Sequence, residues 1–382
     1  MPGALPGDRI RPLQLTGKAR WARAEAHELV APSPERRTPP CPVADRCGGC
    51  DWMAWERPAQ LKGKAQLAAD ALTRIGGVEV PPPDVITAGD ELGWRGRVRL
   101  SVSRDGRAVG FKARGSHDVV DLERCPVATP AVNAGISAVR EAMQAGGLRG
   151  VEGVTLRSAP DGAPVVARVH TRGRLPGGTQ RSLAALRVAI PEGKAAARAA
   201  QRWPLGGAWI APRIDSFTQV HDAANVALVD LVSRHVDAVP GLVVDACSGA
   251  GNFALPLAAS GRAVVAFDLS AAAIDDLGRA ATAQGLDVPA RVGGMQQELE
   301  RLAGDDVGVV VLDPPRKGAK EAVPALLALA PRRIVYVACD PASLGRDTRA
   351  LLAGGYALAH VTCVDLFPQT HHVETVAVFD RS

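Results

Sequence analysis

The stretch LVVDACSGAGNFALPLA, residues 242–258, decides the fold class of this 382-residue chain. It predicts an apolar strand that ends at Asp245, a turn built on Gly249 and Gly251, and an apolar helix. Glycines in such a turn let the backbone approach a ligand closely. A second apolar strand follows and ends in Asp268, where a carboxylate suits a ribose diol. The order strand, turn, helix, strand and acid therefore predicts a nucleotide-type site.

The kind of nucleotide follows from one missing glycine. A dinucleotide fold usually has the pattern G-x-G-x-x-G, and here Ala254 takes the third glycine position. The spacing Asp-x-x-x-Gly-x-Gly instead suits a nucleoside without phosphates, above all S-adenosylmethionine. The alternative is a plain tight turn in an α/β domain.

Short apolar strands alternate with Ala- and Leu-rich helical stretches from about residue 214 onward. Continuous apolar strands between helices indicate a parallel sheet covered on both faces, so we predict a Rossmann-like α/β domain. The third of these strands ends in Asp313, and Pro314 and Pro315 after it force an extended exit. That exit lies at the carboxyl edge of the strands, where open α/β sheets bind ligands.

The charge is distributed unevenly along the chain. Residues 1–213 carry 32 Lys and Arg against 20 Asp and Glu, whereas residues 214–382 carry 13 against 20. Within the front half, basic residues gather at 93–114 and at 168–213. Clustered positive charge attracts a polyanion through counterion release, so we predict that the front half binds nucleic acid. A solvated Arg-rich surface is the alternative.

Two residues near the end of the chain are candidates for chemistry. Cys339 ends the fourth strand, RIVYVAC, and an Asp-Pro pair breaks the chain directly after it. A nucleophilic cysteine works as its thiolate and needs such a partly exposed position, whereas the alternative is a buried structural cysteine. Glu374 lies in the last strand, VETVAVF, where burying a glutamate would be costly unless it had a function. His371 and His372 lack metal-ligand spacing, and we interpret both as surface or RNA-facing residues.

Four further cysteines suggest a metal. Cys41, Cys47 and Cys50 follow the pattern C-x5-C-x2-C, and Cys125 is a distant fourth. In a protein without a secretory signal this pattern indicates a metal rather than disulfides. A zinc site usually pairs two C-x2-C units, whereas Gly48-Gly49 leaves room for something bulky. A [4Fe-4S] cluster uses four thiolates, so an iron–sulfur cluster, zinc and free thiols all stay open at this point; four protein ligands on such a cluster would argue against radical S-adenosylmethionine chemistry.

Composition and patterning set the remaining expectations. An apolar content of 47% with 22% charged residues is ordinary for a globular protein, and no apolar run is long enough for a membrane span or a signal peptide. We therefore expect a cytoplasmic protein. A breaker-rich stretch predicts a linker at 31–40, and helical spacing predicts a helix at 58–75 that is able to pack on the later domain. Short strands with a helix at about 130–145 predict a mixed, mostly antiparallel region over 85–213.

Together these residues resemble the uracil-5 RNA methyltransferase family, whose members make 5-methyluridine in ribosomal RNA or tRNA. The matching motifs, in family order, are SFTQV (216–220), DACSGAGNF (245–253), DPPR (313–316), YVACDPASLGRD (336–347) and LFPQTHHVE (366–374). The iron–sulfur members of that family also carry C-x5-C-G-G-C and a later C-P, as this chain does.

The resemblance implies a class I S-adenosylmethionine-dependent methyltransferase that methylates carbon 5 of a uridine in structured RNA. It implies that Cys339 attacks carbon 6 of the uracil and that Glu374 removes the proton from carbon 5. The implied cofactor-binding residues are Gln219, Cys247, Gly249, Gly251, Asn252, Asp268 and Asp313. The resemblance also favours a [4Fe-4S] cluster over zinc or free thiols, with Cys41, Cys47, Cys50 and Cys125 as its implied ligands. Ribosomal RNA is favoured over tRNA, because bacterial tRNA members mostly lack the cluster.

The chain departs from the family pattern at three positions. Cys247 stands where an aromatic residue is common, Asp268 where glutamate is usual, and Asp340 where asparagine is common. We expect a monomer with three parts: a truncated OB-like (TRAM) segment at 1–40, a central iron–sulfur, RNA-binding domain at 41–213 and a methyltransferase domain at 214–382. The family barrel is longer than the first part, so either it is reduced here or the true start lies upstream.

Three alternatives remain open. The enzyme could act on tRNA. It could be a nitrogen methyltransferase on adenine or glutamine that uses DPPR and needs neither Cys339 nor Glu374. It could also be an iron–sulfur RNA-binding protein with an inactive methyltransferase fold, although the intact Cys339, Glu374 and glycine loop weigh against this.

Overall fold

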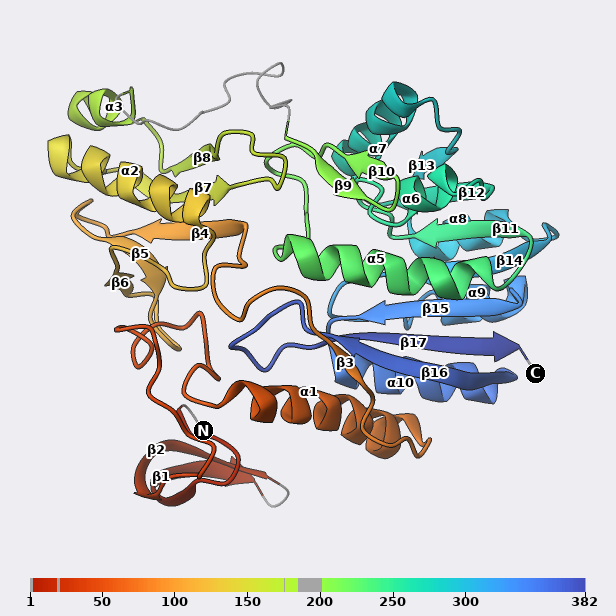
Figure 1. Ribbon diagram of the computed structural model, residues 1–382, viewed down its shortest axis with the longest axis horizontal. Helices are drawn as coiled ribbons and strands as arrows, with labels where there is room; N and C mark the ends of the chain where they lie inside the picture. Colours follow the sequence, from red (N-terminus) through yellow and green to blue (C-terminus); the bar gives the residue numbers. More distant parts are fainter. Residues whose placement is uncertain (1–2, 19–20, 175, 185–200, 382) are drawn as a thin grey trace.

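An eight-stranded sheet forms the centre of one lobe (Figure 1). The computed structural model describes residues 3–18, 21–174, 176–184 and 201–381. The strand order is β13-β12-β11-β14-β15-β17-β16-β3. These strands are β3 (Val85–Ile86), β11 (Leu242–Ala246), β12 (Val264–Asp268), β13 (Ala290–Val292), β14 (Val307–Leu312), β15 (Arg333–Ala338), β16 (Tyr356–Val364) and β17 (Glu374–Arg381).

Helices cover both faces of this sheet. Strands β13, β12, β11, β14 and β15 run parallel, and β14 is buried along its whole length, which requires cover on both sides. One face packs on α5 (Asp222–Asp237), α6 (Ala254–Ala259) and α7 (Ala271–Gln284). The other packs on α8 (Met295–Arg301), α9 (Val323–Leu329) and α10 (Pro341–Ala353). The predicted α/β sheet is confirmed, and the antiparallel insertion of β17 between β15 and β16 is an addition to it.

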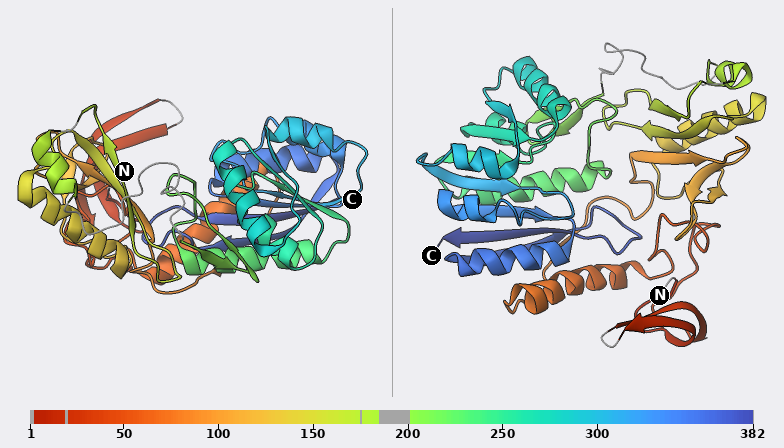
Figure 2. Two further views of the ribbon diagram at one scale, coloured as in Figure 1. Left: turned by 90° about the horizontal axis from the view of Figure 1, so that it is seen from above. Right: turned by 180° about the vertical axis from the view of Figure 1, so that it is seen from behind.

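Segments of the front half join this core. Helix α1 (Arg57–Ala71) continues as a π-helical turn (Leu72–Gly76) and lies along α10 (Figure 2), so the predicted helix at 58–75 and its packing are confirmed. Strand β3 extends the sheet beside β16. The hairpin of β9 (Trp203–Leu205) and β10 (Ala208–Ile210) also packs into the core of the sheet. The domain boundary at residue 214 stays a proposal, and these earlier segments pack across it.

A five-stranded antiparallel sheet forms the second lobe, as the sequence predicted. Its order is β6-β5-β4-β7-β8, and α2 (Pro130–Gly146) packs on one face through Val132, Ile136 and Val139. Thr129 caps α2, because its side chain accepts a hydrogen bond from Val132 N at 3.2 Å. The strands are β4 (Arg97–Val102), β5 (Val109–Lys112), β6 (Val119–Asp121), β7 (Val151–Arg157) and β8 (Val166–Thr171), and α3 (Gly177–Ala184) lies beside α2.

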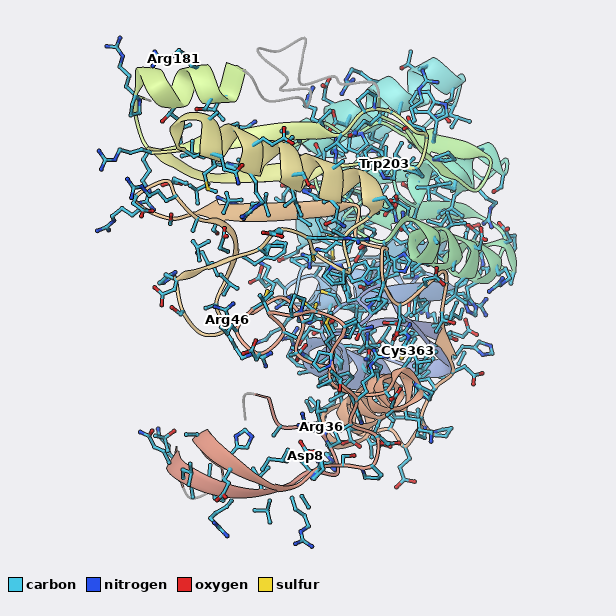
Figure 3. The ribbon with its side chains drawn as sticks, turned by 60° about the vertical axis from the view of Figure 1, so that its left-hand side comes forward. Asp8, Arg36, Arg46, Arg181, Trp203 and Cys363 are labelled. Carbon is cyan, nitrogen blue, oxygen red and sulfur yellow. The ribbon has the colours of Figure 1, made fainter. Side chains whose placement is uncertain are left out.

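The described part of residues 1–40 contains a two-stranded hairpin, β1 (Arg9–Lys18) and β2 (Trp21–Ala31). Asp8 anchors its base by pairing with Arg36 at 2.5 Å and accepting from Ser33 N at 2.9 Å (Figure 3). The OB-like assignment of this segment stays a proposal. Along the described ranges, no helix is long and apolar enough to cross a membrane.

Candidate active site

The parallel strands bring four predicted residues to one edge of the sheet. Ala246 at the end of β11 pairs with Phe267 of β12 and with Leu312 of β14. Cys247, Asp268 and Asp313 each follow directly after these paired positions, and Cys339 follows β15 in the same way. The carboxyl edge of the strands is where open α/β sheets bind ligands.

This edge borders a cavity of about 1120 Å³. The sequence-predicted residues that line it are Gln219, Cys247, Gly249, Asp268, Asp313, Cys339 and Glu374. Gly251 and Asn252 are not among the lining residues. Gly251 has φ +95°, and a Cβ there would meet Leu255 at 2.8 Å, so its role is the turn itself. Asn252 exchanges two hydrogen bonds, of 2.8 and 3.0 Å, with Asn225 of α5.

The carboxylate of Asp268 is oriented by the backbone around it. Its Oδ2 accepts from Gly249 N at 3.0 Å, and its Oδ1 accepts from Ser270 N at 2.7 Å. Each oxygen keeps a lone pair for a hydroxyl donor, which suits the diol predicted for this position. Cys247 holds the loop in a left-handed conformation at φ +84°, although it is not a glycine.

Cys339 and Glu374 come together through the antiparallel strand. Strands β15 and β17 pair Ala338 with Thr375. Because partners in an antiparallel pair run in opposite directions, Cys339, which follows β15 directly, comes next to Glu374, which precedes Thr375. The Glu374 side chain is 2% exposed, and its Oε1 has no hydrogen-bond partner among the described residues. An unpartnered buried carboxyl oxygen beside a thiol suits a group that exchanges a proton with a ligand.

Burial dominates the electrostatics of this pair. It raises the pKa of Glu374 well above its usual value, and the nearby Asp313 raises it further. Burial, Glu374 and Asp313 together raise the pKa of the Cys339 thiol to about 11. Burial and Asp268 raise the pKa of Asp313 to about 7. The cavity therefore gathers carboxyl groups that favour a cationic ligand, and S-adenosylmethionine carries a sulfonium and an ammonium.

His372 is a lining residue whose position the sequence did not reveal. Its ring contacts Phe367, with ring centroids 5.9 Å apart, and its Nε2 lies 3.3 Å from Arg316 Nη2. Burial, His371 and Arg316 lower the pKa of His372 to about 4, so the ring is neutral at physiological pH. His371 does not line this cavity and pairs with Asp51 at 2.5 Å. His371 is exposed and His372 is half-buried, and an RNA-facing role for the two stays a prediction.

The loop before Glu374 is fixed by residues of the front half. Gln369, fully buried and at φ +70°, exchanges hydrogen bonds of 3.0 Å with Gln60 of α1. Glu91 accepts from its amide at 3.0 Å. Lys64 of α1 is also fully buried; it forms an ion pair with Asp365 and donates to the carbonyl of Phe367 at 2.9 Å. Through these contacts, residues of the front half fix the position of the segment that precedes Glu374.

Comparisons with known proteins agree with this geometry. A family model described as tRNA (Uracil-5-)-methyltransferase matches residues 295–382. The chain is 33% identical to the 23S rRNA (uracil(1939)-C(5))-methyltransferase RlmD of Cronobacter sakazakii, over 99% of this chain and 90% of the relative. It is 34% identical to the RlmD of Pseudomonas putida, over 99% of this chain and 88% of the relative.

The chain belongs to the RNA uracil-5 methyltransferase family.

A solved structure supports the same family. The Pyrococcus abyssi tRNA (uracil-54, C5)-methyltransferase in complex with S-adenosyl-L-homocysteine has a TM-score of 0.75 and 25% identity, covering 99% of this chain and 94% of that chain. The fold is therefore a class I methyltransferase, and the protein is a S-adenosylmethionine-dependent RNA uracil-5 methyltransferase. The nitrogen methyltransferase and the inactive fold are accordingly set aside.

The four predicted cluster cysteines of this methyltransferase surround one cavity of about 160 Å³. Burial raises the pKa of Cys50 to about 12, with Cys125 as the next cause, and burial also raises the pKa of Cys47 and Cys125. Across the described ranges, no three His, Cys, Asp or Glu side chains are grouped as they would be around a metal ion. Four thiols lining a shared hollow nevertheless have the donor chemistry of a polynuclear iron–sulfur cluster, so these residues fit such a group.

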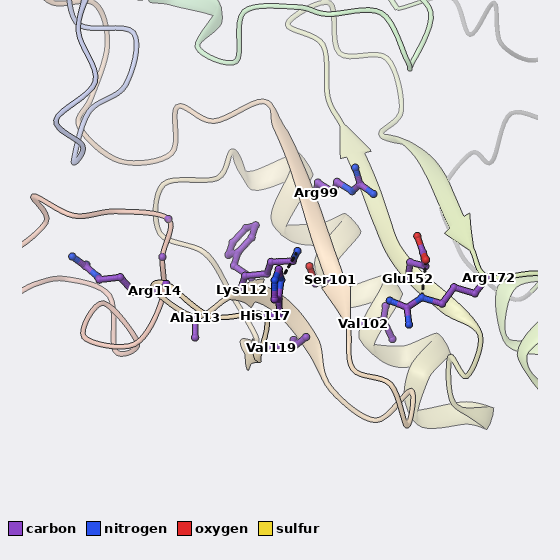
Figure 4. A pocket seen from close by; sticks show the side chains of 14 residues that line it. Arg99, Ser101, Val102, Lys112, Ala113, Arg114, His117, Val119, Glu152 and Arg172 are labelled. Carbon is purple, nitrogen blue, oxygen red and sulfur yellow. Dashed lines mark hydrogen bonds and ion pairs between the residues drawn. The ribbon is translucent and has the colours of Figure 1, made fainter. Parts of the chain in front are cut away.

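A basic groove of about 790 Å³ lies on the second lobe of the methyltransferase (Figure 4). Its cations are Arg99, Lys112, Arg114 and Arg172. Among the described side chains, neither Arg99 nor Lys112 forms an ion pair with an acid. Gly49, Arg99 and Phe111 line both this groove and the cysteine cavity.

The two predicted basic clusters contribute unequally to this groove. Three of its cations come from the stretch 93–114. In the stretch 168–213, Arg168 contacts Asp215, and Arg172 pairs with Glu152 at 2.7 Å. Arg187, Lys194 and Arg198 lie outside the described residues.

Proposed function

We propose that this methyltransferase modifies carbon 5 of a uridine in 23S rRNA through a covalent adduct between Cys339 and the uracil. The observation that carries the proposal is the meeting of Cys339 and Glu374 in one cavity with the predicted cofactor residues. The RlmD relatives, named for a 23S rRNA uracil, support the choice of RNA.

In the proposed mechanism each residue acts on one side of the methyl transfer. The thiolate of Cys339 adds to carbon 6, and the displaced electron pair makes carbon 5 nucleophilic. S-adenosylmethionine supplies the methyl group. Glu374 as carboxylate then removes the carbon-5 proton, and the electrons of that C–H bond restore the double bond and expel the thiolate. The net reaction releases one proton to solvent.

Positive charge beside the thiol favours the first step. Arg316 lowers the pKa of Cys339 against the larger upward effects of burial and the two acids. The ring of His372 is neutral, so it adds no second positive charge beside Arg316 and can accept a hydrogen bond from it. We propose that Gln219, Cys247, Gly249, Asp268 and Asp313 hold S-adenosylmethionine, with Gly251 and Asn252 shaping the loop.

We further propose that Cys41, Cys47, Cys50 and Cys125 hold a [4Fe-4S] cluster. These thiols would hold the cluster between the segment 41–50 and Cys125, which lies in the connection between β6 and α2. Asp51, which follows Cys50, pairs with His371, and Trp52 N donates to the carbonyl of Gln369 at 3.0 Å. The cysteine segment is therefore joined directly to the loop that precedes Glu374. A structural role is consistent with these contacts, because metal binding contributes folding energy.

The basic groove is the proposed docking surface for the RNA backbone. Four cations on a concave surface suit a polyanion, and the central domain at 41–213 supplies all of them. The proposed protein is a monomer with three parts. In chain order, these are a hairpin segment at 1–40, this central domain and the methyltransferase domain at 214–382.

The second candidate substrate is tRNA. It is favoured by the likeness to the Pyrococcus abyssi enzyme, which is named for a tRNA uracil. Sequencing-based mapping of 5-methyluridine in total RNA from a strain lacking the gene decides between them. Loss of one site in 23S rRNA is expected, whereas loss confined to tRNA would overturn the proposed rRNA target.

A further inference from the structure

A second hollow, of about 400 Å³, adjoins the methyl-transfer cavity. Cys339, Arg316 and His372 line both. The second hollow lies between α1 with its π-helical turn and the start of α10, which run side by side (Figures 1 and 2). We call it the α1 cleft, and its residues from the α1 side are Leu67, Asp70, Ala71, Arg74 and Ile75.

Helix α1 and its π-helical turn contribute a row of side chains to the wall of this cleft. Leu67, Asp70, Arg74 and Ile75 recur at helical spacing and so lie on one side of the helix. The neighbouring Ala68 and Leu72 are fully buried against the rest of the protein. Leu67 and Ile75, by contrast, are 40% and 37% exposed. Arg74 and Ile75 belong to the π-helical turn, an arrangement frequent at functional sites.

The chemistry of the walls suits one nucleotide. Leu67 and Ile75 offer apolar surface to the flat face of a base. Arg74, with its side chain 78% exposed, has a 3.5 Å ion pair with the exposed Asp70, which is worth little in water and competes weakly with a phosphate. A hollow of about 400 Å³ is within the size range of small-ligand sites.

The α1 cleft shares Cys339 with the methyl-transfer cavity, and this indicates which ligand the cleft holds. A uracil attacked by Cys339 belongs to an RNA strand, so its neighbours must leave the cavity through an adjoining surface. The α1 cleft shares the nucleophile itself with the cavity. We propose that the α1 cleft holds a nucleotide adjacent to the target uridine, with its base against Leu67 and Ile75 and its phosphate at Arg74. This inference rests on the proposed function, since it assumes that Cys339 attacks a uracil.

Steady-state kinetics test the assignment. The variants are Arg74→Gln alone and the triple variant Leu67→Ser, Arg74→Gln, Ile75→Ser; the control is Lys62→Gln, an exposed cation of α1 outside the cleft. The probe is total RNA from the deletion strain, titrated with methyl-labelled S-adenosylmethionine. We expect the triple variant to raise KM for RNA about tenfold, with kcat and KM for S-adenosylmethionine changed less than about twofold. Arg74→Gln alone should lower the salt dependence of kcat/KM by about one phosphate contact.

The outcomes separate the two proposals. If the wild type transfers no methyl to this RNA, the proposed function itself is wrong. If the wild type is active but both variants match Lys62→Gln in KM for RNA and in salt dependence, the cleft does not hold RNA and the inference is wrong. Arg74→Gln changes an exposed side chain, so its salt dependence decides the matter even if the triple variant folds poorly.

Discussion

The buried ion pair between Lys64 and Asp365 offers a quantitative test of how α1 supports the active site. Both side chains are fully buried, and Asp365 begins the segment that leads to Glu374. Lys64→Met removes the ammonium and leaves the Asp365 carboxylate without its only fully buried cationic partner among the described residues. Breaking a buried pair in this way typically costs about 3–5 kcal/mol.

Two features of the structure place the cost near the lower limit. Asp365 keeps a contact with Arg57, whose side chain is 20% exposed and can follow the change. Methionine also fills most of the space of the lysine stem. We therefore expect Lys64→Met to lower the free energy of unfolding by about 3 kcal/mol. The double variant Lys64→Met, Asp365→Leu should recover most of that loss, because the buried ammonium and carboxylate are removed together and the partly exposed Arg57 can turn to solvent.

Urea titration followed by tryptophan fluorescence measures these differences. The control is Lys62→Met on the exposed side of α1, for which a change within about 0.5 kcal/mol is expected. A loss below about 1 kcal/mol in Lys64→Met, or a double variant as unstable as the single one, would refute the reasoning. In the same proteins kcat should fall with Lys64→Met while binding of S-adenosylmethionine persists.

Three further predictions concern the cysteines and the groove. Protein purified without oxygen should contain about four irons per chain, and Cys125→Ser should lose them along with soluble yield; stoichiometric zinc without iron would contradict this. Replacing Arg99, Lys112 and Arg114 by glutamine should lower the salt dependence of RNA binding by up to about three contacts, while Arg234→Gln on α5 leaves it unchanged; an unaltered slope would move the RNA surface elsewhere. Alkylation of Cys339 by iodoacetamide should accelerate about tenfold per pH unit between about pH 7 and 9, because its pKa of about 11 leaves it mostly as thiol throughout that range; mass spectrometry showing a flat rate would refute the raised pKa.

The parts of the site that the sequence predicted share one cause. Asp268, Asp313 and Cys339 each end or follow an apolar strand, and parallel strands place such positions at one edge whatever the details of packing. Three of the thiols around the cysteine cavity lie within one short segment, so their proximity was predictable from local pattern as well. Cys125 joins them from a distant segment, which local pattern does not reveal.

Other features depend on contacts between distant segments. Gln369 meets Gln60, and Lys64 meets Asp365, across about 300 positions of the chain, and neither pair leaves a local signal. The position of His372 in the cavity follows from the fold of that same loop. Charge counting could not distinguish Arg99, which has no acidic partner among the described side chains, from Arg168, which contacts Asp215. The sequence of a segment shows the sign of its charge. Whether each charge is neutralised by an ion pair depends on residues from distant segments.

The most direct test of the proposed mechanism uses two variants that distinguish the role of Cys339 from the role of Glu374. Each variant is incubated with deletion-strain RNA and methyl-labelled S-adenosylmethionine, then run on a gel that denatures protein. Glu374→Gln should accumulate a slow band that carries the label, because the thiolate adds and the methyl moves but nothing accepts the carbon-5 proton. Cys339→Ala should give neither the band nor methylated RNA. Methylation by Cys339→Ala at a near-normal rate would contradict the covalent mechanism.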